Sequence, residues 1–147
     1  MFYLSEYLEK NRELYYAKLR AISQQEDWNG WIEFFLQAIT KQAKKNSEKV
    51  QQILLLYDQM KQQIQELTHS QYTVQILDTI FDRPIFPASD FAKNTKINKA
   101  TVMGILRKLK SANLIHEIQP SSGRRSAILC FGKLLNITKN RKIFGGN

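Results

Sequence analysis

The side chains best suited to a chemical task in this chain are cations, gathered in two stretches of its second half. The first stretch, residues 96–110, mixes basic and apolar residues, and the second is Arg124-Arg125 next to Gly123. Basic side chains bind nucleic-acid phosphates, and polar side chains near a helix start can reach base edges. The residues predicted to contact DNA are Lys96, Asn98, Lys99, Thr101, Met103, Arg107, Lys108, Arg124 and Arg125.

The formal net charge of +9 belongs entirely to the second half of the chain. Residues 1–70 hold nine Lys and Arg and nine acids, whereas residues 71–147 hold thirteen Lys and Arg against four acids. A basic domain of this kind indicates a polyanionic partner. The alternative is a charged surface that only keeps the protein dissolved.

The residues that usually perform catalysis do not form a set. His69 lies in a polar junction, His116 lies beside Glu117 in an expected strand, and Cys130 is the single cysteine. One cysteine permits neither an internal disulfide nor a cysteine-based zinc cluster, and we expect it to be buried. We therefore expect no enzymatic activity, no metal and no cofactor.

A helix-turn-helix pattern positions the first group of cations. Pro87 to Asp90 can cap a helix that carries Phe91 and Ala92, the turn 95–98 holds one apolar residue, Ile97, and Asn98 can cap the next helix. In that helix the buried stripe is expected at Val102, Ile105, Leu106 and Leu109. Asn113 follows at a position that favours a left-handed residue.

The elements around this motif predict a winged helix. A helix is expected over 72–81 before Pro84, and a short strand at 85–86. Two strands, 114–119 and 126–131, flank the basic turn 120–125 and predict a β-hairpin wing, and a last helical turn is expected over 132–137.

The first half of the chain predicts helices. One or two are expected before residue 23, with a break near Asn11, and Asp27 can cap a longer segment that reaches about Thr68. Apolar residues recur there at heptad spacing. They are Ile32, Leu36, Ile39, Ala43, Val50, Ile53, Tyr57, Met60, Ile64 and Leu67, with Asn46 in the one polar slot. Either one helix or two helices broken near residues 44–47 fit this pattern.

This heptad seam has two possible roles, a homodimeric coiled coil or the buried face of a helical domain. Additional apolar residues beside it, including Phe34, Phe35 and Leu54 to Leu56, widen the stripe. A wide stripe favours packing within a globular bundle.

Residues 2–43 resemble the segment that follows the catalytic helix in Fic-family proteins, through LSEY, NRELYY and DWNGWIEFFL. That family transfers a nucleotide monophosphate, usually AMP, to hydroxyl side chains with an HPFxxGNGR motif. The motif is missing here, because the histidines precede Ser70 and Glu117. The resemblance therefore implies a C-terminal portion of such a protein without the family's activity.

Residues 72–135 resemble the winged helix-turn-helix domain that often follows the catalytic domain in this family. The turn differs, with Thr95 and Lys96 where an apolar residue and a glycine are usual, and Met103 and Gly104 replace polar base readers. Bidentate base contacts need Arg, Asn or Gln, so the substitutions weaken the case for reading a particular sequence.

The sequence thus predicts a mainly α protein: a helical region (1–70) with a long helix, a winged helix-turn-helix with a small β-hairpin (71–137), and a flexible basic tail (138–147). The expected function is DNA binding with a regulatory role in transcription. The alternatives are a protein-interaction or homodimerisation module, or the partner fragment of a separate Fic adenylyltransferase polypeptide. The longest uninterrupted apolar run, 53–57, is too short to cross a membrane, and no secretion signal opens the chain, so a bacterial cytoplasmic location is expected.

Overall fold

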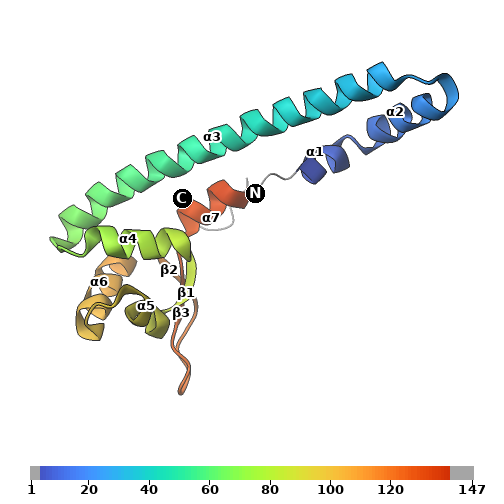
Figure 1. Cartoon of the computed structure of the whole chain (residues 1–147). Helices are drawn as coiled ribbons and strands as arrows, with labels where there is room; N and C mark the ends of the chain where they lie inside the picture. The colour runs from blue at the N-terminus through green and yellow to red at the C-terminus, as the bar shows by residue number, and fades with distance from the viewer. Residues whose placement is uncertain (1–3, 140–147) are drawn as a thin grey trace. The chain divides into compact units, whose positions relative to one another are not determined.

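The computed structural model describes residues 4–139, which are mainly helical with one small antiparallel sheet (Figure 1). This confirms the predicted fold class. The elements are α1 (Leu4–Lys10), α2 (Arg12–Gln25), α3 (Trp28–Thr68), α4 (Thr73–Asp82), β1 (Ile85–Pro87), α5 (Ala88–Thr95), α6 (Lys99–Ser111), β2 (His116–Gln119), β3 (Ile128–Cys130) and α7 (Gly132–Lys139). Within the described range, no helix has both the length and the apolar character needed to cross a bilayer.

The chain divides into two compact units, Met1–Gln51 and Gln52–Asn147, and α3 contributes to both. This division differs from the boundary predicted at residue 70. The reason is that Leu56, Met60 and Ile64 of α3 are buried in the core of the second unit. The tail predicted over 138–147 begins inside α7 and, beyond Lys139, lies outside the described residues.

Aromatic side chains hold the first unit together. The ring of Tyr7 in α1 lies 6.4 Å from that of Phe34, and the ring of Tyr15 in α2 lies 5.5 Å from that of Trp31. Such tilted contacts stabilise beyond the area that they bury. The predicted break near Asn11 separates α1 from α2, and the predicted cap of α3 is present, because Asp27 Oδ1 accepts from the Gly30 amide at 2.9 Å.

Helix α3 is continuous over 41 residues, so of the two alternatives the single helix is confirmed. No proline interrupts it, and Asn46 does not compete with the backbone of the helix. Its Oδ1 atom instead accepts from Gln42 Nε2, one turn earlier, at 3.1 Å. A pair at i, i+4 supports the helix rather than breaking it.

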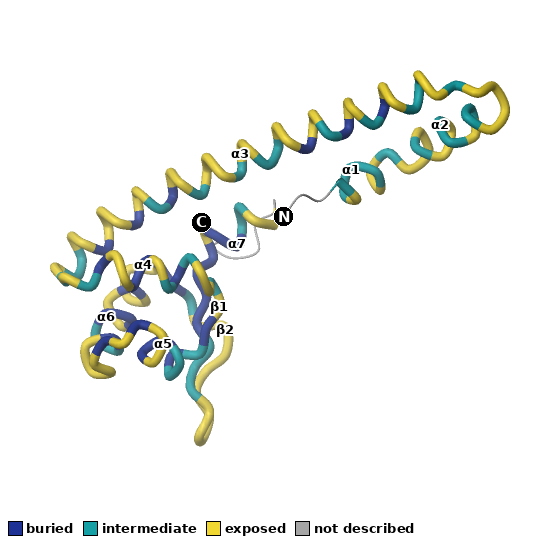
Figure 2. Tube along the Cα trace, in the orientation of Figure 1, coloured by how far each residue is buried: buried dark blue, intermediate teal, exposed yellow. Residues whose placement is uncertain are grey.

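The expectation that the whole heptad seam is core is wrong for its first half. Ile32, Leu36 and Val50 are 51%, 57% and 55% exposed, whereas Met60 and Ile64 are buried. In the first unit the buried residues of α3 are Phe34, Ala38 and Gln42. The physical reason is that α1 and α2 pack on the side of α3 that carries the aromatic residues, which is rotated away from the heptad stripe (Figure 2).

A carboxylate links α1 to α3 in the first unit, and it yields a prediction on pH. Glu6 Oε1 accepts from Lys45 Nζ at 2.8 Å and from Lys10 Nζ at 3.1 Å, and these bonds lower the pKa of Glu6 to about 2. A carboxyl with a lowered folded pKa stabilises the fold above its unfolded pKa and loses this effect as pH falls through the folded value.

We expect an NMR titration of the Glu6 carboxyl to give a midpoint near 2. The midpoint should rise toward the ordinary value of 4.5 in K45A, because Lys45 makes the larger contribution to the shift. The control is K44A, which removes the neighbouring exposed lysine that makes no ion pair with Glu6 among the described residues and should leave the Glu6 midpoint unchanged. An unchanged Glu6 midpoint in K45A would contradict the assignment.

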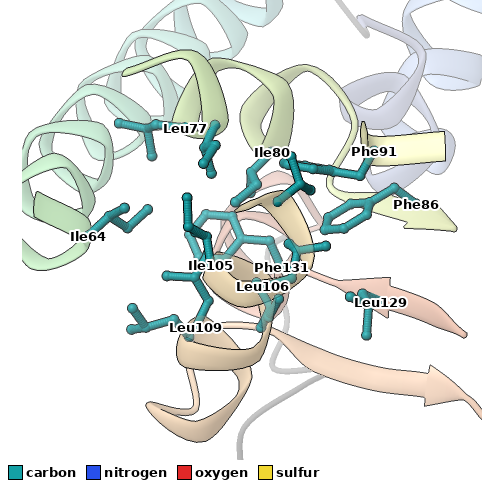
Figure 3. Packing of buried hydrophobic residues seen from close by; sticks show 14 of the residues in the cluster. Ile64, Leu77, Ile80, Phe86, Phe91, Ile105, Leu106, Leu109, Leu129 and Phe131 are labelled. Atoms are coloured by element: carbon teal, nitrogen blue, oxygen red, sulfur yellow. The ribbon is translucent and has the colours of Figure 1, made fainter. Parts of the chain in front are cut away.

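The second unit forms one hydrophobic core between its helices and its sheet. Figure 3 shows Ile64 of α3, Leu77 and Ile80 of α4 and Phe91 of α5 around this interior. Ile105, Leu106 and Leu109 of α6 and Phe131 complete it. The sheet order is β1-β3-β2, and both strand pairs are antiparallel. Phe86 of β1 and Glu117 of β2 both pair with Leu129 of the central strand β3.

Side-chain hydrogen bonds connect α4 to α3 and to α5. Tyr57 Oη in α3 donates to Asp78 Oδ1 in α4, and because the bond stabilises the protonated phenol, it raises the pKa of Tyr57. Gln75 Nε2 in α4 donates to the carbonyl of Thr95, the last residue of α5. Helix α4 thereby anchors both α3 and the end of α5.

Candidate nucleic-acid interface

The turn between α5 and α6 has the geometry that the helix-turn-helix pattern predicts. Lys96 takes the left-handed conformation with φ 54°, Ile97 is buried, and Asn98 Oδ1 accepts from the Ala100 amide at 2.8 Å. Thr95 occupies the usual apolar position. It is tolerated there because its hydroxyl donates to the Phe91 carbonyl at 3.1 Å, which satisfies its buried oxygen.

Helix α6 has one buried face and one open face. The predicted stripe of Val102, Ile105, Leu106 and Leu109 is fully confirmed as core. The centre of the opposite face carries small side chains, since Ala100, Gly104 and Ser111 recur there at helical spacing. Arg107 lies on the same face, between Gly104 and Ser111. A methyl group added at Gly104 would meet nothing within 4 Å, so a partner can approach the helix backbone closely here.

The cations of α6 differ in what they contact. Lys99 and Arg107 are exposed and make no ion pair within the described residues. Lys108 instead donates to the Leu67 carbonyl at the end of α3, at 3.4 Å, and Lys110 pairs with Glu117 of β2. Among the residues predicted to contact DNA, Lys108 therefore lies on the side of α6 that is next to the end of α3.

Met103 is half-buried rather than presented to solvent. It packs against the core and lines a cleft between α6 and β3, together with Arg107, Lys110 and Leu129. Its thioether can offer apolar contact at the rim of a groove but forms no strong hydrogen bond. Thr101 is exposed on the flank of α6 away from Met103.

The wing carries its two arginines at the tip. Ser122 and Arg125 exchange two backbone bonds of 3.1 and 2.9 Å around Gly123 and Arg124, and Gly123 adopts φ 55°, which a two-residue hairpin loop requires. Arg124 and Arg125 are both exposed on this hairpin, which projects beyond α5 and α6 (Figures 1 and 2). Ser89 and Ser126, 2.9 Å apart at their Oγ atoms, attach its base to α5.

Every acid of the second half has a partner. Asp78 accepts from Tyr57, Asp82 lies near Arg83, Asp90 lies near Lys93, and Glu117 pairs with Lys110. Five cations of the turn, α6 and the wing have no acidic partner among residues 4–139, and they are Lys96, Lys99, Arg107, Arg124 and Arg125. Their combined positive field is therefore not neutralised locally.

The remaining chemical residues are dispersed. Cys130 is buried, and this burial raises the pKa of its thiol. In the part of the chain that the structure describes, no three His, Cys, Asp or Glu side chains converge as metal ligands would. No protein-family model matches the chain.

The sequence did not reveal the Lys110–Glu117 pair or the contact between Ser89 and Ser126. Each depends on how α5 and α6 pack against the hairpin. Glu117 is the one acid that follows Asp90 in the sequence, which indicates an ion pair with one of the many nearby cations but does not identify which one.

Gly104 yields the first prediction for this interface. We expect G104A to raise the free energy of unfolding by about 1 kcal/mol, because alanine favours the helix and the added methyl meets no neighbour. The same methyl should weaken binding to duplex DNA if the open face of α6 enters a groove. Urea denaturation and a duplex titration measure the two effects. Loss of stability, or unchanged affinity, would contradict the placement of α6.

Glu117 yields the second prediction. We expect E117Q to increase affinity for duplex DNA, because it removes a negative charge from the interface and releases Lys110. If Lys110 then binds a phosphate, the slope of log affinity against log salt should steepen by ~0.9. D82N, which neutralises an exposed acid paired with Arg83, is the control and should change affinity less. Equal effects of the two variants would contradict this role of Glu117.

Proposed function

We propose that this protein is a DNA-binding winged-helix module that acts by binding rather than by catalysis. The observation that carries the proposal is a set of five cations on the turn, α6 and the wing tip that have no acidic partner within the described residues 4–139. They are Lys96, Lys99, Arg107, Arg124 and Arg125. They surround an α6 face of small side chains that a partner can approach closely. Transcriptional regulation is the role that such a module most often serves.

In this proposal α6 enters the major groove, which is about 12 Å wide and admits one helix. Asn98, Thr101 and Met103 lie near the entering end of α6, while Lys96, Lys99 and Arg107 neutralise phosphates. The wing tip reaches the adjacent backbone or minor groove, where guanidinium groups bind well. Lys108 contributes less, because it already donates to the Leu67 carbonyl.

The proposed binding is mainly electrostatic. Met103 is half-buried and Gly104 has no side chain, so among Asn98, Thr101 and Met103 two residues, Asn98 and Thr101, offer exposed polar groups toward bases. Asn98 also uses its side-chain oxygen to cap the helix. We therefore expect modest discrimination between sequences and a strong dependence on salt.

A titration of the full chain on duplex DNA at several salt concentrations tests the proposal. Five phosphate contacts give a slope of log affinity against log salt of about −4 to −5, at ~0.9 per contact. Absence of micromolar binding at low salt would refute the proposal. A heparin column alone does not suffice, because any basic protein is retained on it.

The resemblance of residues 2–43 to Fic-family proteins supports a further part of the proposal. The chain would be the non-catalytic C-terminal portion of such a protein, since it contains no HPFxxGNGR motif. In the alternative that this resemblance suggests, it would be the partner of a separate Fic adenylyltransferase polypeptide. Two measurements distinguish these alternatives. Co-purification with a Fic catalytic polypeptide would support the partner role, whereas binding to duplex DNA without such a polypeptide would support the DNA-binding module.

A further inference from the structure

One face of α3 carries exposed apolar side chains from the heptad seam, together with Leu54 beside the seam. Ile32, Leu36, Val50 and Leu54 lie on one face of this helix, each between 51% and 60% exposed, and Ala43 lies between them on the same face. Neither α1 nor α2 reaches this face, because both contact the side that carries Phe34 and Trp31. Exposed apolar residues gathered on one helix face indicate an interaction surface.

We propose that this stripe, residues 32–54 of α3, is a homodimer interface in which two copies of α3 pack antiparallel and cross at Ala43. The proposal concerns a surface that contains none of the residues proposed to contact DNA, so it goes beyond the proposed function and can fail or succeed separately. Three features of the stripe point to a second copy rather than to another protein.

The first feature is the spacing of the exposed residues. The steps between Ile32, Leu36, Ala43, Val50 and Leu54 are four, seven, seven and four, so the order is the same from either end. In a two-fold interface, residue i contacts residue j while j contacts i. An antiparallel pair centred on Ala43 places Ile32 opposite Leu54 of the second copy and Leu36 opposite Val50.

The second feature is the centre of the stripe. Ala43 is the smallest of these side chains and lies where the two helices approach most closely. Heptad spacing corresponds to helices that cross at about 20°.

The third feature is charge. Lys61 continues the same face of α3 beyond Leu54, and Glu26 and Asp27 precede α3 at the opposite end. An antiparallel pair brings Lys61 near these two acids of the second copy, at both ends of the interface. A parallel pair would bring the two Lys61 side chains together instead. Residues 1–70 carry nine basic and nine acidic residues, so the half of the chain that contains most of the stripe has no net charge.

Light scattering on the full chain tests the dimer. We expect a mass twice the 17.2 kDa of the chain at micromolar concentration, and a single-chain mass for V50K, which places two lysines in the symmetric interface. V74K is the matched control, because Val74 is also on a helix and 46% exposed, and it should remain dimeric. Circular dichroism confirms that both variants are folded. A monomeric parent chain, or a dimeric V50K, would overturn the proposal.

Crosslinking tests the antiparallel arrangement. With oxidised glutathione, A43C should form a disulfide-linked dimer, and a mixture of L36C and V50C chains should crosslink to each other much more than either does alone. Native Cys130 is buried and serves as the unreactive background. Efficient crosslinking of L36C with itself would indicate parallel helices and overturn the arrangement. An increase of apparent mass only when another protein is added would identify a different occupant and overturn the dimer as well.

Discussion

Charge reversal of Arg124 and Arg125 is expected to weaken binding to duplex DNA of every sequence by on the order of 60-fold at about 0.1 M salt. Each lost phosphate contact removes ~0.9 from the salt slope, which at this concentration corresponds to about eightfold in affinity. Both side chains are exposed at the tip of the wing and have no acidic partner among residues 4–139. The measurement is a titration of R124E/R125E by fluorescence anisotropy at several salt concentrations.

The matched control is R20E/K44E, which changes the net charge by the same amount at two exposed helical positions of the first unit. If general attraction to a polyanion explained binding, the two double variants would lose affinity equally. A wing that contacts the backbone predicts a larger loss and a flatter salt slope for R124E/R125E. Because phosphate contacts carry no sequence information, ratios between duplexes should stay the same.

Truncation of Leu56 is expected to lower the free energy of unfolding of the second unit by about 2–5 kcal/mol, the cost of losing buried methyl groups and leaving a cavity. Leu56 lies in α3, is 7% exposed, and belongs to the core that includes Met60 and Ile64. Urea denaturation of L56A, followed by the signal of the second unit, measures the loss. DNA binding should disappear at the same urea concentration, because that core supports α6.

L55A is the control for this experiment, because Leu55 is the same residue type at the adjacent position and is 63% exposed. A surface substitution of this kind usually changes stability by less than about 0.5 kcal/mol. Equal effects of L55A and L56A would contradict the assignment of this part of α3 to the core. A chain that starts at residue 71 lacks Leu56, Met60 and Ile64, and we expect it to be unstable for the same reason.

Local sequence signals determined most of the second unit. The position of Pro84, the capping side chain of Asn98 and the stripe from Val102 to Leu109 predicted the helix-turn-helix, and the structure has it. The turn at Gly123 predicted the wing in the same way, because only a few residues adopt the required positive φ. These features depend on neighbours within a few residues in the chain, so the sequence alone was sufficient.

The partners of the charged side chains could be identified only from the folded structure. The sequence showed where the basic excess lies, but not that Lys110 pairs with Glu117 or that Lys108 points to the carbonyl of Leu67. These contacts join α6 to β2 and to α3, and their distances are set by packing of the whole unit. The set of proposed phosphate contacts could therefore be reduced only after the helices had been placed.

The long helix α3 also separates what the sequence predicts locally from what depends on packing. By itself, the sequence determined that residues after Asp27 form a helix with a heptad stripe, because periodicity is a local property. Only the tertiary structure decided which face of that helix is buried: Phe34 and Ala38 in the first unit, and Leu56, Met60 and Ile64 in the second. The physical reason is that burial depends on which other helices supply apolar surface, and α1 and α2 cover a face that leaves Ile32, Leu36 and Val50 exposed.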